Sequence, residues 1–292
     1  MTSSGWRSLV LRSVVALALV AASGCGRRSA ITVSDPPPAT TPTSVATSSS
    51  NSTNGSTTAA TAAATTTATV PGPVVVGLGN SVPSGSACSC VNFVSAYAAM
   101  VAAGKNAKAT VDNDAVSGST SADVVNQLSH AGSVQAHVRA ATTVLIMTGA
   151  NDFNDAFDAV SLGAPATTMF PPVATAVQDN VTAVVQRIQA LNRNAHVVVL
   201  DYWAAMEDGA VAAKDYDAPT MAASLASTNY VNDALAVAAK ATGALYVSTY
   251  TAFKGPSGAN DPTGLLAADG DHPNASGHQL IARTIFTVLP SG

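Results

Sequence analysis

The segment PVVVGLGNS, residues 73–81, decides the expected fold. Its β-branched run is typical of a buried strand, and the run stops at a glycine that polar residues follow. Four further apolar runs predict strands at residues 108–111, 143–147, 196–200 and 245–249. Helical patterns lie between or after these runs, at residues 91–103, 121–140, 173–191, 228–241 and 276–289. Strands that alternate with helices predict an α/β fold with a mostly parallel sheet and helices on both of its faces.

The composition narrows the classes of partner that the chain can have. It has 292 residues, a net charge of -4 and only 10% charged residues. A protein that binds nucleic acid usually carries a clustered basic patch, and this sequence has no basic block or basic helix face. We therefore expect no nucleic-acid partner. The part after residue 72 holds about 220 residues, a normal size for one domain, which we expect to be a monomer.

The first 25 residues have the pattern of an export signal. Arg7 and Arg12 precede an apolar stretch over residues 14–22, and small residues lead to Cys25. The stretch is shorter than the roughly 20 apolar residues that a spanning helix needs. Cys25 follows Ser-Gly as in a bacterial lipoprotein signal, although Ala22 stands where leucine is usual. We expect a lipid on Cys25 that anchors the chain to the outer face of the cell membrane; the alternative is a plain secretory signal that releases it.

Residues 26–72 are predicted to form a flexible stalk. They consist mostly of Ser, Thr, Ala and Pro, with almost no large apolar side chain. Such a segment cannot bury enough apolar surface to offset the entropy lost on ordering. The composition changes at Pro73, and we place the catalytic domain at residues 73–292.

The remaining two cysteines are Cys88 and Cys90. An even number of cysteines in an oxidising compartment is compatible with a disulfide between them. No second pair of Cys or His residues stands at ligand spacing, so we expect no metal site.

Polar blocks follow several of the predicted strands, and open α/β sheets bind ligands at the carboxyl ends of their strands. Hydrolysis of an ester needs a nucleophile, a base that a third group orients, and donors for the developing oxyanion. Ser81 on a glycine-flanked turn suits the nucleophile, His272 the general base, and Asp269 the group that orients the base. The backbone N–H groups of Ser81 and Gly118 and the side chain of Asn151 can supply the oxyanion hole.

Taken together and in this order, the blocks resemble the SGNH (GDSL) hydrolase family over about residues 74–290. The match is full at Gly149-Ala150-Asn151-Asp152 and at Asp269-Gly270-Asp271-His272, whereas Asn80 stands where the family has Asp. The resemblance implies a flavodoxin-like, three-layer α/β/α sandwich with a parallel five-stranded sheet. It also implies the same catalytic and oxyanion-hole residues, no cofactor, and cleavage of carboxylic esters through an acyl-enzyme. The Cys-x-Cys pattern with the export signal looks like exported actinobacterial members.

Within that resemblance several readings stay open. The substrate is expected to be a short-chain acyl ester or a glycan or lipid ester of the cell surface. An acyltransferase or deacetylase acting on envelope glycan would use the same chemistry, and a non-catalytic surface lipoprotein could keep the fold. We expect His278 to be a packing or capping residue rather than a second base. Tyr202 and Trp203 suit either a substrate pocket or the core.

Overall fold

A computed structural model of the chain describes residues 71–291. The predicted signal peptide, the stalk up to residue 70 and the predicted lipid site Cys25 lie outside these residues. They stay predictions from the sequence.

The core of the domain is one parallel sheet of five strands in the order β2-β1-β3-β4-β5. The strands are β1 (Val74–Gly79), β2 (Thr110–Asn113), β3 (Thr143–Met147), β4 (His196–Leu200) and β5 (Leu245–Val247). This is the flavodoxin-like strand order, which has its ligand site at the carboxyl edge of the sheet. The predicted α/β fold class is confirmed. The second strand lies two residues later than the predicted run.

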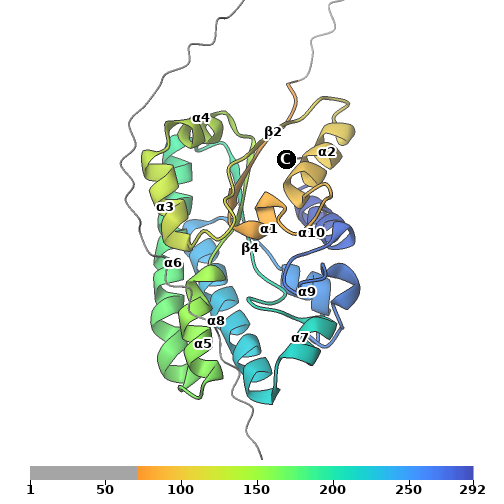
Figure 1. The fold of residues 1–292 in the computed structure, drawn as a ribbon. Helices are drawn as coiled ribbons and strands as arrows, with labels where there is room; N and C mark the ends of the chain where they lie inside the picture. Colours follow the sequence, from red (N-terminus) through yellow and green to blue (C-terminus); the bar gives the residue numbers. More distant parts are fainter. Residues whose placement is uncertain (1–70, 292) are drawn as a thin grey trace, which may run out of the picture. The chain divides into compact units, whose positions relative to one another are not determined.

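Helices cover both faces of the sheet, which makes three layers (Figure 1). One face is covered by α2 (Phe93–Gly104) and α10 (Ala275–Val288), which contact each other. The other is covered by α3 (Ser121–His130), α4 (Gly132–Ala140), α6 (Ala166–Leu191) and α8 (Ala218–Thr242). Shorter helices join them: α1 (Ser81–Ser84), α5 (Asn154–Ser161), α7 (Gly209–Asp215), α9 (Thr249–Lys254) and the 3₁₀ turns η1 (Asn151–Phe153) and η2 (Thr263–Leu265).

No helix within residues 71–291 is both long and apolar enough to cross a membrane.

The strands are apolar because most of them are buried on both faces. Every residue of β3 is buried, and in β1 only Val74 is partly accessible. A strand enclosed by two helical layers reads as a continuous apolar run, and this is why the sequence identified these strands. The described polar blocks begin where the runs stop, at the carboxyl edge.

Three predicted helices have clearly different bounds in the structure, and one of them, predicted over residues 228–241, begins at Ala218. The predicted helix over residues 121–140 is divided at Ala131, which has an extended conformation and separates α3 from α4. The predicted helix over residues 173–191 begins earlier, at Ala166, and runs through Pro171 and Pro172. Proline normally interrupts a helix interior, so the sequence pattern started this helix after the prolines.

The backbone at the end of β1 passes very close to β3. Gly79 has φ +129°, and a Cβ built there would lie 1.8 Å from the carbonyl oxygen of Met147. Only glycine tolerates both this conformation and this contact. The start of the turn that carries Ser81 therefore depends on a residue without a side chain.

We expect Gly79→Ala to lower the free energy of unfolding by about 2 kcal/mol or more, because the added methyl group must push the two strands apart. Gly104→Ala is the matched control, since Gly104 ends α2 and faces open space. The control should be neutral or stabilise the domain by up to about 1 kcal/mol. Chemical denaturation of both variants measures the difference, and equal stabilities would contradict the proposed contact.

Candidate active site

Ser81 begins α1, the short helix that directly follows β1. Asn80 caps this helix, and its backbone N–H donates to the carbonyl oxygen of Met147 at 3.1 Å. Gly85 ends the helix in the left-handed conformation. The serine is half-buried and stands at the carboxyl edge of the sheet, where the sequence predicted a ligand site.

Asn80 is buried, and its amide uses both of its ends. The side-chain oxygen accepts from the backbone N–H of Val82 at 3.2 Å, and Nδ2 donates to the hydroxyl of Tyr202 at 2.9 Å. A carboxylate can only accept, so an Asp at this position could not make the second bond in the same direction. Asn80, which departs from the family pattern, thus has a hydrogen-bond partner 122 residues away in the sequence.

His272 and Asp269 lie together in the loop between η2 and α10. The imidazole Nδ1 is 2.8 Å from Oδ2 of Asp269, and the other carboxylate oxygen accepts from the backbone N–H groups of Asp271 and His272 at 3.1 Å each. Burial opposes ionisation of Asp269, but these hydrogen bonds outweigh it and lower the pKa of the carboxyl group. Asp269 therefore holds both the ring and the turn that carries it.

The other ring nitrogen of His272, Nε2, is buried and has no hydrogen-bond partner within the described residues. With Nδ1 facing a carboxylate, the neutral ring carries its proton on Nδ1 and leaves Nε2 as an acceptor. The carboxylate of Asp271 lies farther from Nδ1, at 3.5 Å. Asp269 is thus the closer of the two carboxylates, and its role as the orienting acid stays a prediction.

The loop that contains Gly118 is attached next to the serine turn. The N–H of Val116 donates to the carbonyl oxygen of Gly79 at 2.9 Å, two residues before Ser81. Gly118 has φ +82°, and no atom lies within 4 Å of the position that a Cβ would occupy. Asn151, at the start of η1, donates one amide hydrogen to the carbonyl oxygen of Ser119 at 2.9 Å. This bond connects two predicted oxyanion-hole residues through a common loop, and the amide has a second hydrogen for a ligand.

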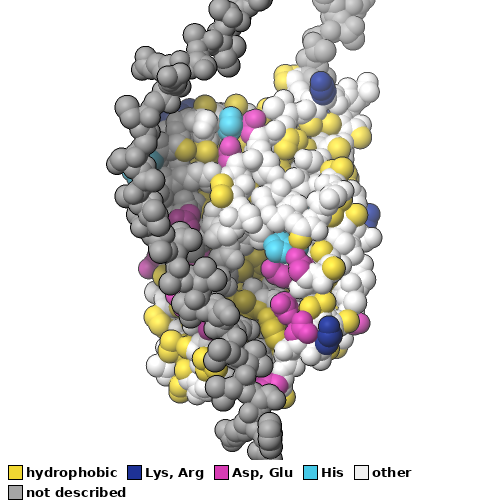
Figure 2. All heavy atoms as spheres, viewed as in Figure 1, with side chains coloured by type: hydrophobic (Ala, Val, Ile, Leu, Met, Phe, Trp, Pro, Cys, Tyr) yellow, Lys and Arg dark blue, Asp and Glu magenta, His cyan; other side chains and the backbone are white. Residues whose placement is uncertain are grey.

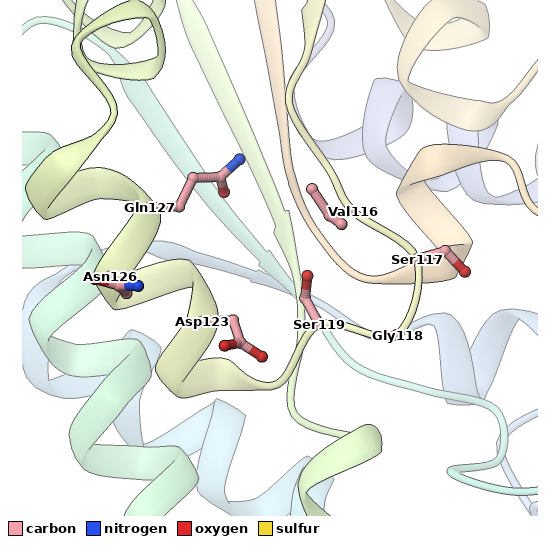
Figure 3. Close-up of a pocket in the computed structure, with 7 residues that line it drawn as sticks. All are labelled: Val116, Ser117, Gly118, Ser119, Asp123, Asn126 and Gln127. Atoms are coloured by element: carbon pink, nitrogen blue, oxygen red, sulfur yellow. The ribbon is translucent and has the colours of Figure 1, made fainter. Parts of the chain in front are cut away.

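A cavity of about 410 Å³ borders this loop. Figure 3 shows Asp123, Asn126 and Gln127 of α3 across from the loop that carries Gly118. The side chains that line this space are mostly polar. It lies on the oxyanion side of the predicted site.

Asp152 follows Asn151 in the sequence but serves the scaffold. Its carboxylate accepts from the backbone N–H of Ser121 at 2.8 Å and from the Ser121 hydroxyl at 2.6 Å. Burial raises the pKa of Asp152, and the bonds from Ser121 oppose this rise. The acid fastens the first turn of α3 to the end of β3, a role that the sequence alone did not reveal.

Cys88 and Cys90 are joined by a disulfide in the loop between α1 and α2. His278 of α10 lies close to both sulfur atoms. Its ring is fully buried, accepts from the backbone N–H of Phe93 at 3.3 Å and stacks on the Phe93 ring. Burial lowers the pKa of His278 to about 4. Its contacts are those of a packing residue.

Comparisons with known proteins show the family and the fold. The sequence profile of the GDSL-like lipase/acylhydrolase family matches residues 78–280. The chain belongs to this family. It is a carboxylic-ester hydrolase, the activity that defines the family. No sequence among curated proteins matched the chain.

Solved structures of low sequence identity share the fold. A lipase from a goat rumen metagenome superposes with a TM-score of 0.58 at 16% identity, covering 73% of this chain and 95% of that one. A catalytic mutant of an acetylxylan esterase from Geobacillus stearothermophilus gives 0.51 at 17% identity, with 74% and 94% covered. An alpha/beta hydrolase from the metagenome of Lake Arreo gives 0.51 at 18% identity, with the same coverage.

We expect Tyr202→Phe to lower the free energy of unfolding by about 1–3 kcal/mol, because it leaves the buried Nδ2 of Asn80 without an acceptor. Tyr250→Phe is the matched control: it removes the same atom from a tyrosine whose hydroxyl makes no hydrogen bond within residues 71–291. Thermal denaturation measures both variants. Equal losses would show that the Asn80–Tyr202 bond does not hold the serine turn.

Proposed function

We propose that this ester hydrolase works through an acyl-enzyme on Ser81, with His272 as general base and Asp269 as the acid that orients it. The observation that carries the proposal is the state of the imidazole. Asp269 binds its Nδ1 at 2.8 Å, while its Nε2 is buried without a partner and available for a proton. A base that an acid holds in one tautomer can take the proton of a serine hydroxyl.

In the first half of the reaction, Nε2 of His272 takes the proton from the Ser81 hydroxyl while Oγ forms a bond to the ester carbonyl carbon. The carbonyl π electrons move to its oxygen and give a tetrahedral oxyanion. The intermediate then collapses, the bond to the alcohol oxygen breaks, and the imidazolium gives its proton to that oxygen. Asp269 stabilises the imidazolium that exists between these two proton transfers.

The oxyanion would be bound by the N–H groups of Ser81 and Gly118 and by the side chain of Asn151. The bond from Asn151 to the loop at Ser119 supports this assignment, because it fixes the amide before any substrate arrives. Donors that need no reorganisation contribute most when charge develops in the transition state.

In the second half, His272 takes a proton from a water molecule, which attacks the acyl carbon, and Ser81 leaves with the proton returned by the imidazolium. This step releases a carboxylic acid and regenerates the free hydroxyl of Ser81. We propose short-chain acyl esters, or glycan or lipid esters of the cell surface, as substrates. The support for this class is the export pattern that the sequence shows before residue 73.

Ser81→Ala should abolish hydrolysis of a short-chain nitrophenyl ester, because it removes the hydroxyl proposed to accept the acyl chain. A fluorophosphonate probe should modify the wild-type protein at Ser81, which peptide mass mapping can locate. Ser86→Ala, a serine hydroxyl in the loop after α1, is the control and should keep its activity. Full activity of Ser81→Ala, or labelling at another residue, would sink the proposal.

Asp269→Asn should lower kcat by about 10²–10⁴, because the amide can hold the turn but no longer fixes the tautomer or stabilises the imidazolium. Asp271→Asn is the matched control, since its carboxylate lies 3.5 Å rather than 2.8 Å from the same nitrogen. It should cost far less. Steady-state kinetics on one ester compares the two, and a greater loss for Asp271→Asn would reverse the assignment.

A further inference from the structure

A second cavity of about 310 Å³ lies between the segment after β4, the first half of α8 and the end of α9. Its apolar walls come from Trp203 and Ala204 on one side and from Met221, Ala222 and Leu225 of α8 on the other. Trp203 is itself supported from behind by Phe253, whose ring stacks on it at 4.3 Å. The cavity is at the lower end of the range for small-molecule sites.

The walls of this cavity are attached to both halves of the proposed catalytic apparatus. Trp203 follows Tyr202, the residue whose hydroxyl binds Asn80 beside the serine. Asp208 lines the cavity, and its backbone N–H donates to the carbonyl oxygen of Gly270 at 2.7 Å. Gly270 lies between Asp269 and His272. A backbone hydrogen bond thus joins the wall of this cavity to the loop that carries Asp269 and His272, whereas Gly118 itself lines the first cavity.

The chemistry of acyl transfer assigns a direction to each side. The carbonyl oxygen must point at the oxyanion donors, near Gly118 and Asn151. The oxygen of the alcohol must point at Nε2 of His272, because that nitrogen gives it a proton as the bond breaks. The alcohol part of an ester thus extends toward the side on which the second cavity lies.

We propose that this cavity is the subsite for the alcohol part of the substrate, and that it takes an uncharged, mostly apolar alcohol of about ten non-hydrogen atoms. The size follows from the cavity volume and from the share of about 30 Å³ that a water molecule takes in the liquid. This assignment rests on the acyl-enzyme mechanism proposed above.

The charges around the cavity favour a neutral occupant over an anionic one. Lys254 and Asp208 line it as a mostly buried pair, with Nζ 2.6 Å from Oδ2, and they neutralise each other. Glu207 also lines the cavity, and burial raises its pKa, as do the nearby carboxylates of Asp215 and Asp271. An alcohol with a phosphate or carboxylate group would meet these acids. The ammonium of Lys254 has further N–H groups that can donate to an oxygen of a neutral alcohol.

Figure 2 shows acidic side chains gathered beside a histidine on the face of the molecule in view, next to a hollow in which hydrophobic side chains are visible. This is the combination of surfaces that the proposal needs: polar side chains at the edge and an apolar interior.

The test fills the cavity and varies the two parts of the ester separately. Ala222→Phe adds a ring at an exposed helix position that lines the cavity, and Ala241→Phe makes the same change at an exposed position of α8 away from it. Naphthyl acetate carries an alcohol of the proposed size, ethyl acetate a small one. Each variant is compared with the wild type on the same ester, so that differences in leaving-group reactivity cancel.

We expect Ala222→Phe to lower kcat/KM for naphthyl acetate by about 10-fold or more, the usual effect of blocking an apolar subsite, while ethyl acetate changes by no more than about twofold. Ala241→Phe should change neither. A loss that grows from ethyl acetate to ethyl hexanoate would place the acyl chain in the cavity instead and overturn the proposal. So would an equal loss on all esters.

Binding of naphthol, measured by calorimetry, gives a readout that does not depend on catalysis. The wild type and Ala241→Phe should bind it, and Ala222→Phe should bind it about 10-fold more weakly or not at all. If the wild type cleaves no ester yet binds naphthol in this pattern, the proposed mechanism fails and the alcohol-subsite assignment fails with it, and the cavity is then a binding site for an apolar aromatic molecule only. If no protein binds naphthol, or if Ala222→Phe binds it as well as the wild type, the subsite proposal is wrong.

Discussion

The backbone hydrogen bond from the N–H of Asn80 to the carbonyl oxygen of Met147 fixes the position of the proposed site on the fold. It continues the pairing of β1 with β3 past the last residue of β1, and so carries the serine turn to the end of the neighbouring strand. Gly79 makes this possible, because any side chain there would collide with the same carbonyl group. The serine, the loop of Gly118 and the start of η1 meet at this edge because all three follow adjacent parallel strands.

Around that edge, polar side chains serve mainly to hold backbone segments in place. Asp152 binds the first turn of α3, Asn151 binds the loop at Ser119, and Asp269 binds the turn of His272. The bond of Asp152 joins two helix ends, that of Asn151 joins a helix end to a loop, and those of Asp269 close a turn within one loop. A site assembled from loops can keep its geometry only if such bonds replace the ladder that strands have. Asp152 and Asp269 therefore hold backbone segments of the site in place.

The parts of this design that local sequence patterns encode could be predicted. The buried strands β1, β3 and β4 appear as apolar runs because both of their faces are covered, and the polar blocks after the strands gave the order in which the site residues occur. Asp269 was identified because it stands three residues before His272 in the same loop. Long-range partners could not be found in this way. The bond between Asn80 and Tyr202 spans 122 residues, and the cavity wall at Asp208 depends on a backbone contact with Gly270. The continuation of α6 through two prolines could not be predicted, because helix propensity describes single residues and tertiary packing can override it.

The acidic side chains of the site give a physical reason for a neutral residue at position 80. Asp269, Asp271 and Glu207 already gather near the imidazole, and burial raises the pKa of Glu207. A carboxylate at position 80 would lie on the residue directly before Ser81, whose backbone N–H is a proposed oxyanion donor. It would repel an oxyanion formed there. An amide keeps the acceptor that the helix cap needs and adds no charge, while Tyr202 supplies the acceptor for its second end. Burial raises the pKa of the Tyr202 hydroxyl, so this partner also stays neutral. An amide in place of an acid therefore preserves the turn and leaves the negative charge of the site on the side of the proposed base, where it would stabilise an imidazolium, and away from the side where the oxyanion would form.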